Sequence, residues 1–377
     1  MVIKNGLVFT EDKRFEKKTV YIENGLFVTE AEWEKIHFQD GDSEEVDASG
    51  CYLIPGLVDV HSHGAMGHDF SDGSADGLAE ILRYQYAHGI TTYCPTTMSL
   101  PKEKLLQAFT SLKELSMLSP SSSAPMSFVP GVHMEGPFVD PEKRGAQKRE
   151  YLLYPDVDFF KDCLDVAKSK ISLLTLAPNL PGSIPFIKEF SNEITISLGH
   201  TNCDYDTAIA AIDVGGTHIT HLFNAMAPLH HRNPGLIGAA LDRDNVYVEL
   251  IADGIHVHDA MIRNAFRMFP NRLCLISDSM RATGMPDGTY DLGEQNVHVT
   301  GTLATLSDGT IAGSATNLFE CMCYAIQIGV PMEDAIAAAT ITPAKSIGLY
   351  DKLGSVSPGK RADLLMLNQK MELLRIF

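Results

Sequence analysis

The stretch LIPGLVDVHSHG, residues 53–64, is an apolar run that ends in a group of polar residues. Asp59, His61 and His63 stand there at alternate positions, and side chains two residues apart on a β-strand point the same way. We therefore expect His61 and His63 to converge at the end of a buried strand. Two converging imidazoles indicate a metal site, although a lone His-x-His pair is also compatible with ordinary hydrogen bonding. The remainder of the chain has to distinguish these two interpretations.

Runs rich in β-branched residues recur along the chain, and helical patterns such as residues 75–89 and 204–216 separate them. The runs are GLVDV (56–60), GITTYCPTT (89–97), SFVPGVHMEG (127–136), ISLLTLAPN (171–179), ITISLGHT (194–201), THITHLFNA (217–225), VYVELIADG (246–254) and RLCLISDS (272–279). Eight such strand-then-helix repeats predict an α/β protein with a closed (β/α)8 TIM-type barrel. A Rossmann sheet is the alternative, but no G-x-G-x-x-G follows the first strand.

Both ends of the chain have a sequence pattern that differs from the strand-then-helix repeats of the barrel. Residues 2–55 read as short strands with turns at Asn5-Gly6 and Asn24-Gly25, and residues 354–367 return to turns and a strand. We therefore predict a small β-sandwich domain built from residues 1–55 and 350–377, and a barrel domain of residues 56–349. Within the barrel, the Gly-rich stretch 284–314 predicts a β-hairpin excursion over the barrel mouth.

Composition and charge exclude several classes of protein. The net charge is −18, and no Lys/Arg run is long enough to follow a phosphate backbone, so we expect neither nucleic acid nor an anionic membrane as partner. No segment approaches the roughly 18 apolar residues of a membrane span. The cysteines number 7, show no C-x-x-C spacing and are expected to be reduced, which favours a cytoplasmic protein. The densest basic stretch, residues 142–150, is either a solvated loop or a local site for an anion.

Metal-ligand side chains gather at the carboxyl ends of the predicted strands, where barrel enzymes place their catalytic groups. They are His61 and His63 after the first strand, Glu135 after the third, His200 after the fifth, His221 after the sixth and Asp278 after the eighth. This constellation favours the metal interpretation of the opening stretch. His218 faces away from His221, and His133 and Asp59 each lie one layer below a candidate ligand, so packing or orienting roles are expected for them.

The predicted set of ligands suits amide hydrolysis. A divalent ion held by Glu135, His200 and His221 would keep an open position for water, whose pKa coordination lowers to about 7. Asp278, close by, would take the proton of that water during attack and return it to the leaving amine. The ligands accept zinc, iron, manganese or cobalt.

Five motifs taken together give the chain a family resemblance. They are PGLVDVHSHG (55–64), HMEGPF (133–138), SLGHT (197–201), THLFNAM (220–226) and SDSM (277–280). With them the chain resembles the amidohydrolase superfamily and, within it, the N-acetylglucosamine-6-phosphate deacetylases, nearly end to end. The fourth strand ends LAPN, without the lysine of many binuclear amidohydrolases, so Glu135 would have to be the bridging carboxylate. That difference favours the deacetylases over dihydroorotase-like or hydantoinase-like relatives.

The resemblance implies a function and a site. It implies metal-dependent hydrolysis of the acetamide of N-acetyl-D-glucosamine 6-phosphate in amino-sugar catabolism, by a homodimer. Glu135, His200 and His221 would hold the main ion, His61 and His63 allow a second, and Asp278 would be the acid and base. Contacts to the substrate would come from Ala146, Gln147, Asn224, Ala225, His231, Arg232, His256, Ala312, Gly313 and Ser314. His256 would either polarise the amide carbonyl or only contact the sugar.

Alternatives are open for the phosphate site and for the function. The loop after the sixth strand would lie beside a twofold axis, so that His231 or Arg232 would approach the phosphate of the neighbouring subunit. The alternative enzymes are an N-acetylgalactosamine-6-phosphate deacetylase and an N-acyl amino acid deacylase. A catalytically inactive scaffold is a further alternative, and retention of every ligand and of Asp278 argues against it.

Overall fold

The largest sheet of the protein is a ring of parallel strands. The computed structural model describes residues 1–37, 44–115, 117, 124–168 and 170–377. Its 8-stranded sheet has the order β17-β16-β15-β14-β13-β12-β11-β8. These strands span Leu57–Ser62 (β8), Ile90–Thr97 (β11), Val132–Glu135 (β12), Ile171–Leu176 (β13), Thr195–Leu198 (β14), Gly216–Ile219 (β15), Tyr247–Ile251 (β16) and Leu273–Ile276 (β17). Each predicted run overlaps one strand, and the predicted (β/α)8 barrel is confirmed.

Hydrogen bonds between the segments at and after the ends of β8 and β17 close the ring. The backbone N–H of Asp278 donates to the carbonyl of His61 at 2.9 Å, and that of His63 donates to the carbonyl of Ser279 at 2.8 Å. One layer below, the Ser277 hydroxyl donates to Asp59 at 2.5 Å. The first and last strands of the barrel therefore meet where the polar strand ends lie.

Helices pack around the barrel, as their apolar faces require. They span Ala75–Ala87 (α2), Lys102–Leu115 (α3), Val157–Val166 (α4), Ser183–Phe190 (α5), Tyr205–Asp213 (α6), Gly235–Leu241 (α7), Asp259–Met268 (α8), Leu318–Gln327 (α9), Met332–Ala339 (α10) and Ile341–Ser346 (α11). Side chains of Ser74, Asp156, Asp204 and Asn317 accept backbone N–H groups at the starts of α2, α4, α6 and α9. These caps satisfy N–H groups that the helices leave free, which fixes where the helices begin.

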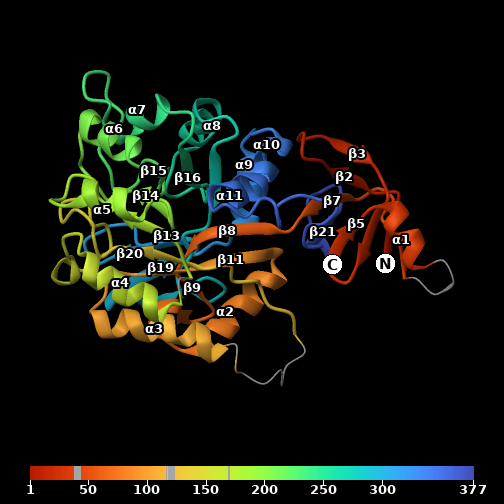
Figure 1. Ribbon diagram of the computed structural model, residues 1–377, viewed down its shortest axis with the longest axis horizontal. Helices are drawn as coiled ribbons and strands as arrows, with labels where there is room; N and C mark the ends of the chain where they lie inside the picture. Colours follow the sequence, from red (N-terminus) through yellow and green to blue (C-terminus); the bar gives the residue numbers. More distant parts are fainter. Residues whose placement is uncertain (38–43, 116, 118–123, 169) are drawn as a thin grey trace.

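The two ends of the chain build a smaller β-sandwich beside the barrel (Figure 1). One sheet has the order β5-β4-β1-β6 and the other β22-β21-β7-β2-β3. Their strands span Val2–Lys4 (β1), Leu7–Phe9 (β2), Phe15–Lys17 (β3), Val20–Glu23 (β4), Leu26–Val28 (β5), Glu45–Asp47 (β6), Tyr52–Pro55 (β7), Leu364–Leu367 (β21) and Leu373–Ile376 (β22), and α1 spans Glu30–Ile36. Ile3, Phe27, Leu53 and Leu364 meet in one buried core between the sheets.

The excursion from the barrel differs from the expected hairpin by one strand. Strands Gly288–Leu292 (β18), Gln295–Thr300 (β19) and Leu303–Leu306 (β20) form an antiparallel sheet of 3 strands. The third strand forms because residues 303–306 fold back onto β19, with Val297 opposite Leu306. Short elements complete the chain at Gly64–Ala65 (β9), His68–Asp69 (β10), Phe70–Asp72 (η1) and Arg149–Tyr151 (η2). No helix in the described part of the chain combines the length and the apolar character needed to span a membrane.

The core of the sandwich generates a stability prediction. Leu364 is 0% exposed between the two sheets, whereas Leu374 on β22 is 52% exposed. Leu364→Ala should lower the free energy of unfolding by about 2–5 kcal/mol, because it leaves a cavity in a closed core. Leu374→Ala, the matched control, should change it by less than about 0.5 kcal/mol. Denaturant unfolding of both variants measures the difference, and equal losses would contradict the proposed packing.

Candidate active site

Three side chains from the ends of strands β12, β14 and β15 converge at the carboxyl end of the barrel. Glu135 is the last residue of β12, and His200 and His221 follow β14 and β15. The Glu135 Oε1 atom lies 3.0 Å from Nε2 of His200 and 3.2 Å from Nε2 of His221. Each of the three residues is no more than 4% exposed. They form one of the groups whose ligand atoms all lie within 4.8 Å of one another.

Hydrogen bonds outside this trio fix how its members point. His200 donates its Nδ1–H to the main-chain carbonyl of Lys143 at 2.8 Å, which leaves Nε2 as the nitrogen that faces the trio. The Gln147 amide donates to the Glu135 Oε2 atom at 2.8 Å and accepts from the Ser99 N–H at 2.6 Å. Gln147, predicted to touch the substrate, therefore holds the Glu135 carboxylate with its side chain.

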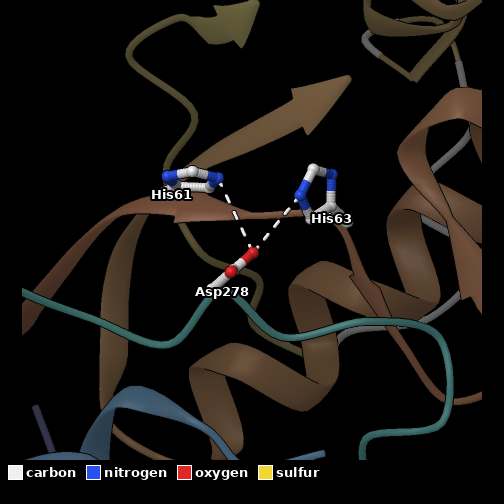
Figure 2. A group of neighbouring side chains, drawn as sticks. All are labelled: His61, His63 and Asp278. Atoms are coloured by element: carbon white, nitrogen blue, oxygen red, sulfur yellow. Dashed lines mark ion pairs between the residues drawn. The ribbon is translucent and has the colours of Figure 1, made fainter. Parts of the chain in front are cut away.

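His61, His63 and Asp278 form a second group (Figure 2). The Asp278 Oδ1 atom lies 3.6 Å from Nε2 of His61 and 3.3 Å from Nε2 of His63. Glu135 joins the two groups, because its carboxylate also lies 3.3 Å from His61 and 3.5 Å from His63. A single carboxylate thus stands between two sets of candidate ligands.

The charges of the cluster compensate one another. Burial opposes ionisation of Glu135, but the neighbouring imidazoles of His61 and His200 hold the pKa of its carboxyl well below the usual value. Burial also raises the pKa of the Asp278 carboxyl, but His61 and His63 lower it below the usual value. Burial lowers the pKa of His61, yet Glu249, Glu135 and Asp278 together raise it well above its ordinary value. The carboxylates therefore stay ionised although they are buried.

Three residues of the two candidate ligand groups adopt left-handed backbone conformations. The φ angles are +46° at His200, +26° at His221 and +48° at Asp278. Such angles cost a non-glycine residue on the order of 1–3 kcal/mol and persist only where the surrounding structure enforces them. Here they occur just after strands β14, β15 and β17, where the chain leaves the barrel and the side chains lie in the cluster. The strained backbone conformations therefore occur at residues whose side chains converge in the cluster.

His256 lies at the same end of the barrel and is paired with an acid. Its Nδ1–H donates to Asp253 Oδ2 at 2.7 Å, and Asp253 Oδ1 accepts the main-chain N–H of His256 at 2.9 Å. Burial lowers the pKa of His256, but the hydrogen bond and charge of Asp253 raise it above the ordinary value. The ring is thereby held with its Nε2–H free to donate a hydrogen bond.

A cavity of about 430 Å³ opens above these groups. Eleven of the predicted site residues line it, namely His63, Glu135, Ala146, Gln147, His200, His221, Asn224, Ala225, His256, Asp278 and Gly313. Leu292, Gln295 and Leu306 of the β18–β20 sheet also line it, so this sheet covers part of the mouth. The Gln295 amide donates to the carbonyl of Ala146 and ties the sheet to the opposite loop.

Five predicted site residues lie outside the lining of this cavity. His61 lies behind it, 0% exposed, in contact with Glu135 and Asp278. Ser314 is also 0% exposed and donates its hydroxyl to the carbonyl of Ser277 at 2.6 Å, and Ala312 is buried. His231 and Arg232 are exposed, and Arg232 borders a separate groove with Asp204 and Asp242.

The positive charge inside the cavity comes from the basic stretch that the sequence singled out. Lys143 and Arg144 line the cavity, and the Arg144 guanidinium donates to the carbonyl of Pro141 at 3.0 Å. Residues 142–147 of the stretch therefore form a wall of the cavity, and two of its cations are placed to meet an anionic group there.

Two buried acids of the site were missed from the sequence. Glu249 in the middle of β16 accepts a hydrogen bond from His61, and Asp253 orients His256. Each had a signal. Glu249 is the one charged residue inside the apolar run VYVELI, and Asp253 stands three residues before His256 in DGIH. A carboxylate in a buried strand requires a polar partner, so the acid inside this apolar run could have been matched to the histidines at the strand ends.

The donor set suits a divalent metal ion. Imidazole nitrogens and carboxylate oxygens are ligands for zinc, iron, manganese and cobalt. The buried Nε2 atom of His61 has no hydrogen-bond partner within the described residues, although two carboxylates lie close to it. A cation shared by these nitrogens and oxygens would satisfy them together, so the residues fit such an ion.

Comparisons with known proteins agree with this geometry. Residues 52–376 match the Amidohydrolase family. N-acetylglucosamine-6-phosphate deacetylase of Bacillus subtilis is 36% identical over 379 residues, covering 99% of this chain and 94% of the relative. The protein of the same name from Bos taurus is 37% identical over 354 residues, covering 90% of this chain and 85% of the relative.

Solved structures of such deacetylases have the same fold. The enzyme of Pasteurella multocida superimposes with a TM-score of 0.89 at 28% identity, covering 100% of this chain and 97% of that one. An aspartate-to-alanine mutant of the Mycobacterium smegmatis enzyme, solved in complex with N-acetyl-D-glucosamine-6-phosphate, gives a TM-score of 0.89 at 29% identity with the same coverage. The resemblance seen in the five motifs is confirmed. This chain belongs to the amidohydrolase family and, within it, to the N-acetylglucosamine-6-phosphate deacetylases.

Proposed function

We propose that this chain hydrolyses the acetamide of N-acetyl-D-glucosamine 6-phosphate to D-glucosamine 6-phosphate and acetate, in amino-sugar catabolism. The observation that carries the proposal is the convergence of Glu135, His200 and His221 beside Asp278 at one cavity. Relatives that span nearly the whole chain bear the name of this activity. No specific observation favours the galactosamine phosphate or an N-acyl amino acid as substrate.

Glu135, His200 and His221 would hold the principal ion, and His61, His63 and Asp278 would allow a second. When bound, a divalent ion would supply Lewis-acid polarisation and favour the ionised form of water. The chain holds the ligand atoms in position whichever divalent ion binds, and whether one ion or two are present. Glu135, held by Gln147, and His200, held by the Lys143 carbonyl, keep their ligand atoms in place without an ion.

Asp278 is the proton carrier of the proposed reaction. The imidazoles around it lower the pKa of its carboxyl, so it is ionised and ready to accept a proton from the attacking water. It then returns the proton to the amine nitrogen as the C–N bond breaks. His256, fixed by Asp253, donates from Nε2 to the amide oxygen as negative charge develops there.

Recognition of the phosphate is proposed to involve a second copy of the chain. Lys143 and Arg144 bring positive charge to the cavity from the same chain. His231 and Arg232 are exposed on the loop after β15, away from that cavity, so they would reach a phosphate only from a neighbouring subunit. We therefore propose a homodimer in which these residues complete the site of the partner.

A cytoplasmic location is also part of the proposal. All of the cysteines are free in the structure, and five of them are buried, as expected for a protein that is kept in a reducing environment.

The first prediction concerns the ligand trio. His200→Ala or His221→Ala should lose bound metal and lose release of glucosamine 6-phosphate and acetate, because two remaining ligands are too few to hold the ion. Elemental analysis and an acetate-release assay measure both effects in the same preparation. His298→Ala, which removes an exposed histidine of β19, is the control and should keep metal and turnover. A trio variant with full metal content and full turnover would contradict the assignment.

The second prediction separates metal binding from proton transfer. Asp278→Asn should keep metal at the trio while kcat falls by about 10²-fold or more, because the positioned acid and base is lost. Asp165→Asn, on the exposed side of α4, is the control. Near-normal turnover of Asp278→Asn would make Asp278 a structural residue and move the proton carrier to His256.

The third prediction tests phosphate recognition and the dimer. Arg232→Ala should raise KM for the 6-phosphate more than it lowers kcat, because a charge-assisted contact acts in ground and transition states alike. Unphosphorylated N-acetylglucosamine should be little affected, and Arg149→Ala, an exposed arginine of η2, is the control. Equal losses on both substrates would make Arg232 a structural residue. Monomers by light scattering at assay concentration would exclude the shared site.

A further inference from the structure

Glu249 is a buried carboxylate with no role in the proposed reaction. It stands in the middle of β16 and is 0% exposed, inside the barrel and below the ligand cluster. A carboxylate in such a place loses its hydration and is tolerated only where polar partners replace the water. The partners that it has therefore show what it does.

A single oxygen of Glu249 accepts hydrogen bonds from two candidate metal ligands. The Oε2 atom accepts the Nδ1–H of His61 at 2.8 Å and the main-chain N–H of His221 at 3.0 Å. His61 belongs to β8 and His221 to the segment after β15, so strand β16 joins two ligands that are distant in sequence. The bond to His221 is made at one of the left-handed residues, where φ is +26°.

The other neighbours of Glu249 do not compete for this oxygen. His218 lies 3.8 Å from the Oε1 atom, and its Nδ1 atom is instead paired with the Ser197 hydroxyl at 3.0 Å. His61, His133 and Glu249 could in principle gather around an ion of their own, since their ligand atoms lie within 4.8 Å. His133 excludes this arrangement, because the Val60 carbonyl at 3.2 Å and the Thr175 hydroxyl at 2.7 Å occupy its two ring nitrogens.

The hydrogen bond at Nδ1 of His61 determines which ring nitrogen remains to bind a metal ion. With the Nδ1–H held by Glu249, Nε2 is the ring nitrogen that is left to meet a metal ion, and it lies 3.3 Å from Glu135 and 3.6 Å from Asp278. We propose that Glu249 is a positioning residue that orients His61 through its ring and His221 through its main chain, so that both present Nε2 to metal. The inference rests on the metal site of the proposed function. It adds that a residue of β16 holds the ligands His61 and His221 in position.

The experiment compares two substitutions in the metal-free full-length protein, each titrated with Zn²⁺. Glu249→Leu keeps a similar side-chain volume but removes the oxygen that accepts both hydrogen bonds. The ion that depends on His61 should therefore bind about 10–100-fold more weakly. Glu249→Gln keeps an oxygen at the same reach, so it should restore most of that affinity and stay within about tenfold of wild type. Calorimetric titration and elemental analysis after dialysis measure affinity and stoichiometry without any assay of turnover.

Asp59→Asn is the matched control. Asp59 is also 0% exposed and lies below His61, but it accepts only the main-chain N–H of His61, at 3.2 Å, and bonds to Ser277. It should bind Zn²⁺ like wild type, because the substituted amide keeps an acceptor oxygen for the His61 N–H and only the buried charge is lost. Equal weakening in Asp59→Asn and Glu249→Leu would overturn the inference, since any buried carboxyl group would then have the same effect.

Thermal unfolding distinguishes positioning from general destabilisation. The metal-free Glu249→Leu protein should melt lower than metal-free wild type, because the His61 ring and the His221 main-chain N–H lose their buried acceptor. The comparison that isolates positioning is therefore the shift in melting temperature that Zn²⁺ adds to each protein. The stabilisation of Glu249→Leu by added Zn²⁺ should be smaller, because weaker binding stabilises less. Wild-type affinity in Glu249→Leu, or a wild-type protein that binds only one ion without His61, would overturn the inference while the proposed function stood. A wild-type protein that binds no ion would overturn the metal site itself.

Discussion

Closure of the barrel between β8 and β17 is the constraint on which the site depends. The closing contacts join His61 to Asp278, His63 to Ser279 and Asp59 to Ser277. The same segments carry the candidate ligands His61, His63 and Asp278, which lie at opposite ends of the barrel sequence. Without closure these side chains would stand at two edges of an open sheet. The hydrogen bonds that close the ring therefore also bring the parts of the site together.

Charge balance is the second constraint, because the site places several imidazoles and carboxylates where water is excluded. Glu135 and Asp278 remain ionised against the cost of burial because imidazoles surround them, and the carboxylates in turn raise the pKa of His61. Isolated buried charges of either sign would be far costlier than this alternating arrangement. Protons and a divalent ion are alternative sources of the same positive charge, so a protein that holds the ligands this closely without metal is already arranged to receive it.

Much of this could be predicted from the sequence, because strand periodicity and the strand-end rule of barrels depend on local pattern. They located all eight barrel strands and the residues that meet at Glu135. The left-handed φ angles at His200, His221 and Asp278 could not be predicted, since no glycine marks them and only the surrounding packing enforces them. Glu249 was missed because its partner His61 belongs to a strand that is not its neighbour in the sheet. The third strand of the excursion was missed because the Gly-rich turns of residues 284–314 obscure where one strand ends and the next begins.

Reaction type and substrate are set by different parts of the molecule, and this explains why one is easier to infer than the other. The groups proposed to break the amide bond lie at strand ends, are buried and are fixed by hydrogen bonds such as those of Gln147 and Asp253. The groups that would meet the phosphate lie on loops, where Lys143 and Arg144 wall the cavity and Arg232 is exposed. Strand-end chemistry follows from the fold of a single chain. Loop recognition depends on how the loops pack, and for Arg232 on whether a second chain brings it to the cavity.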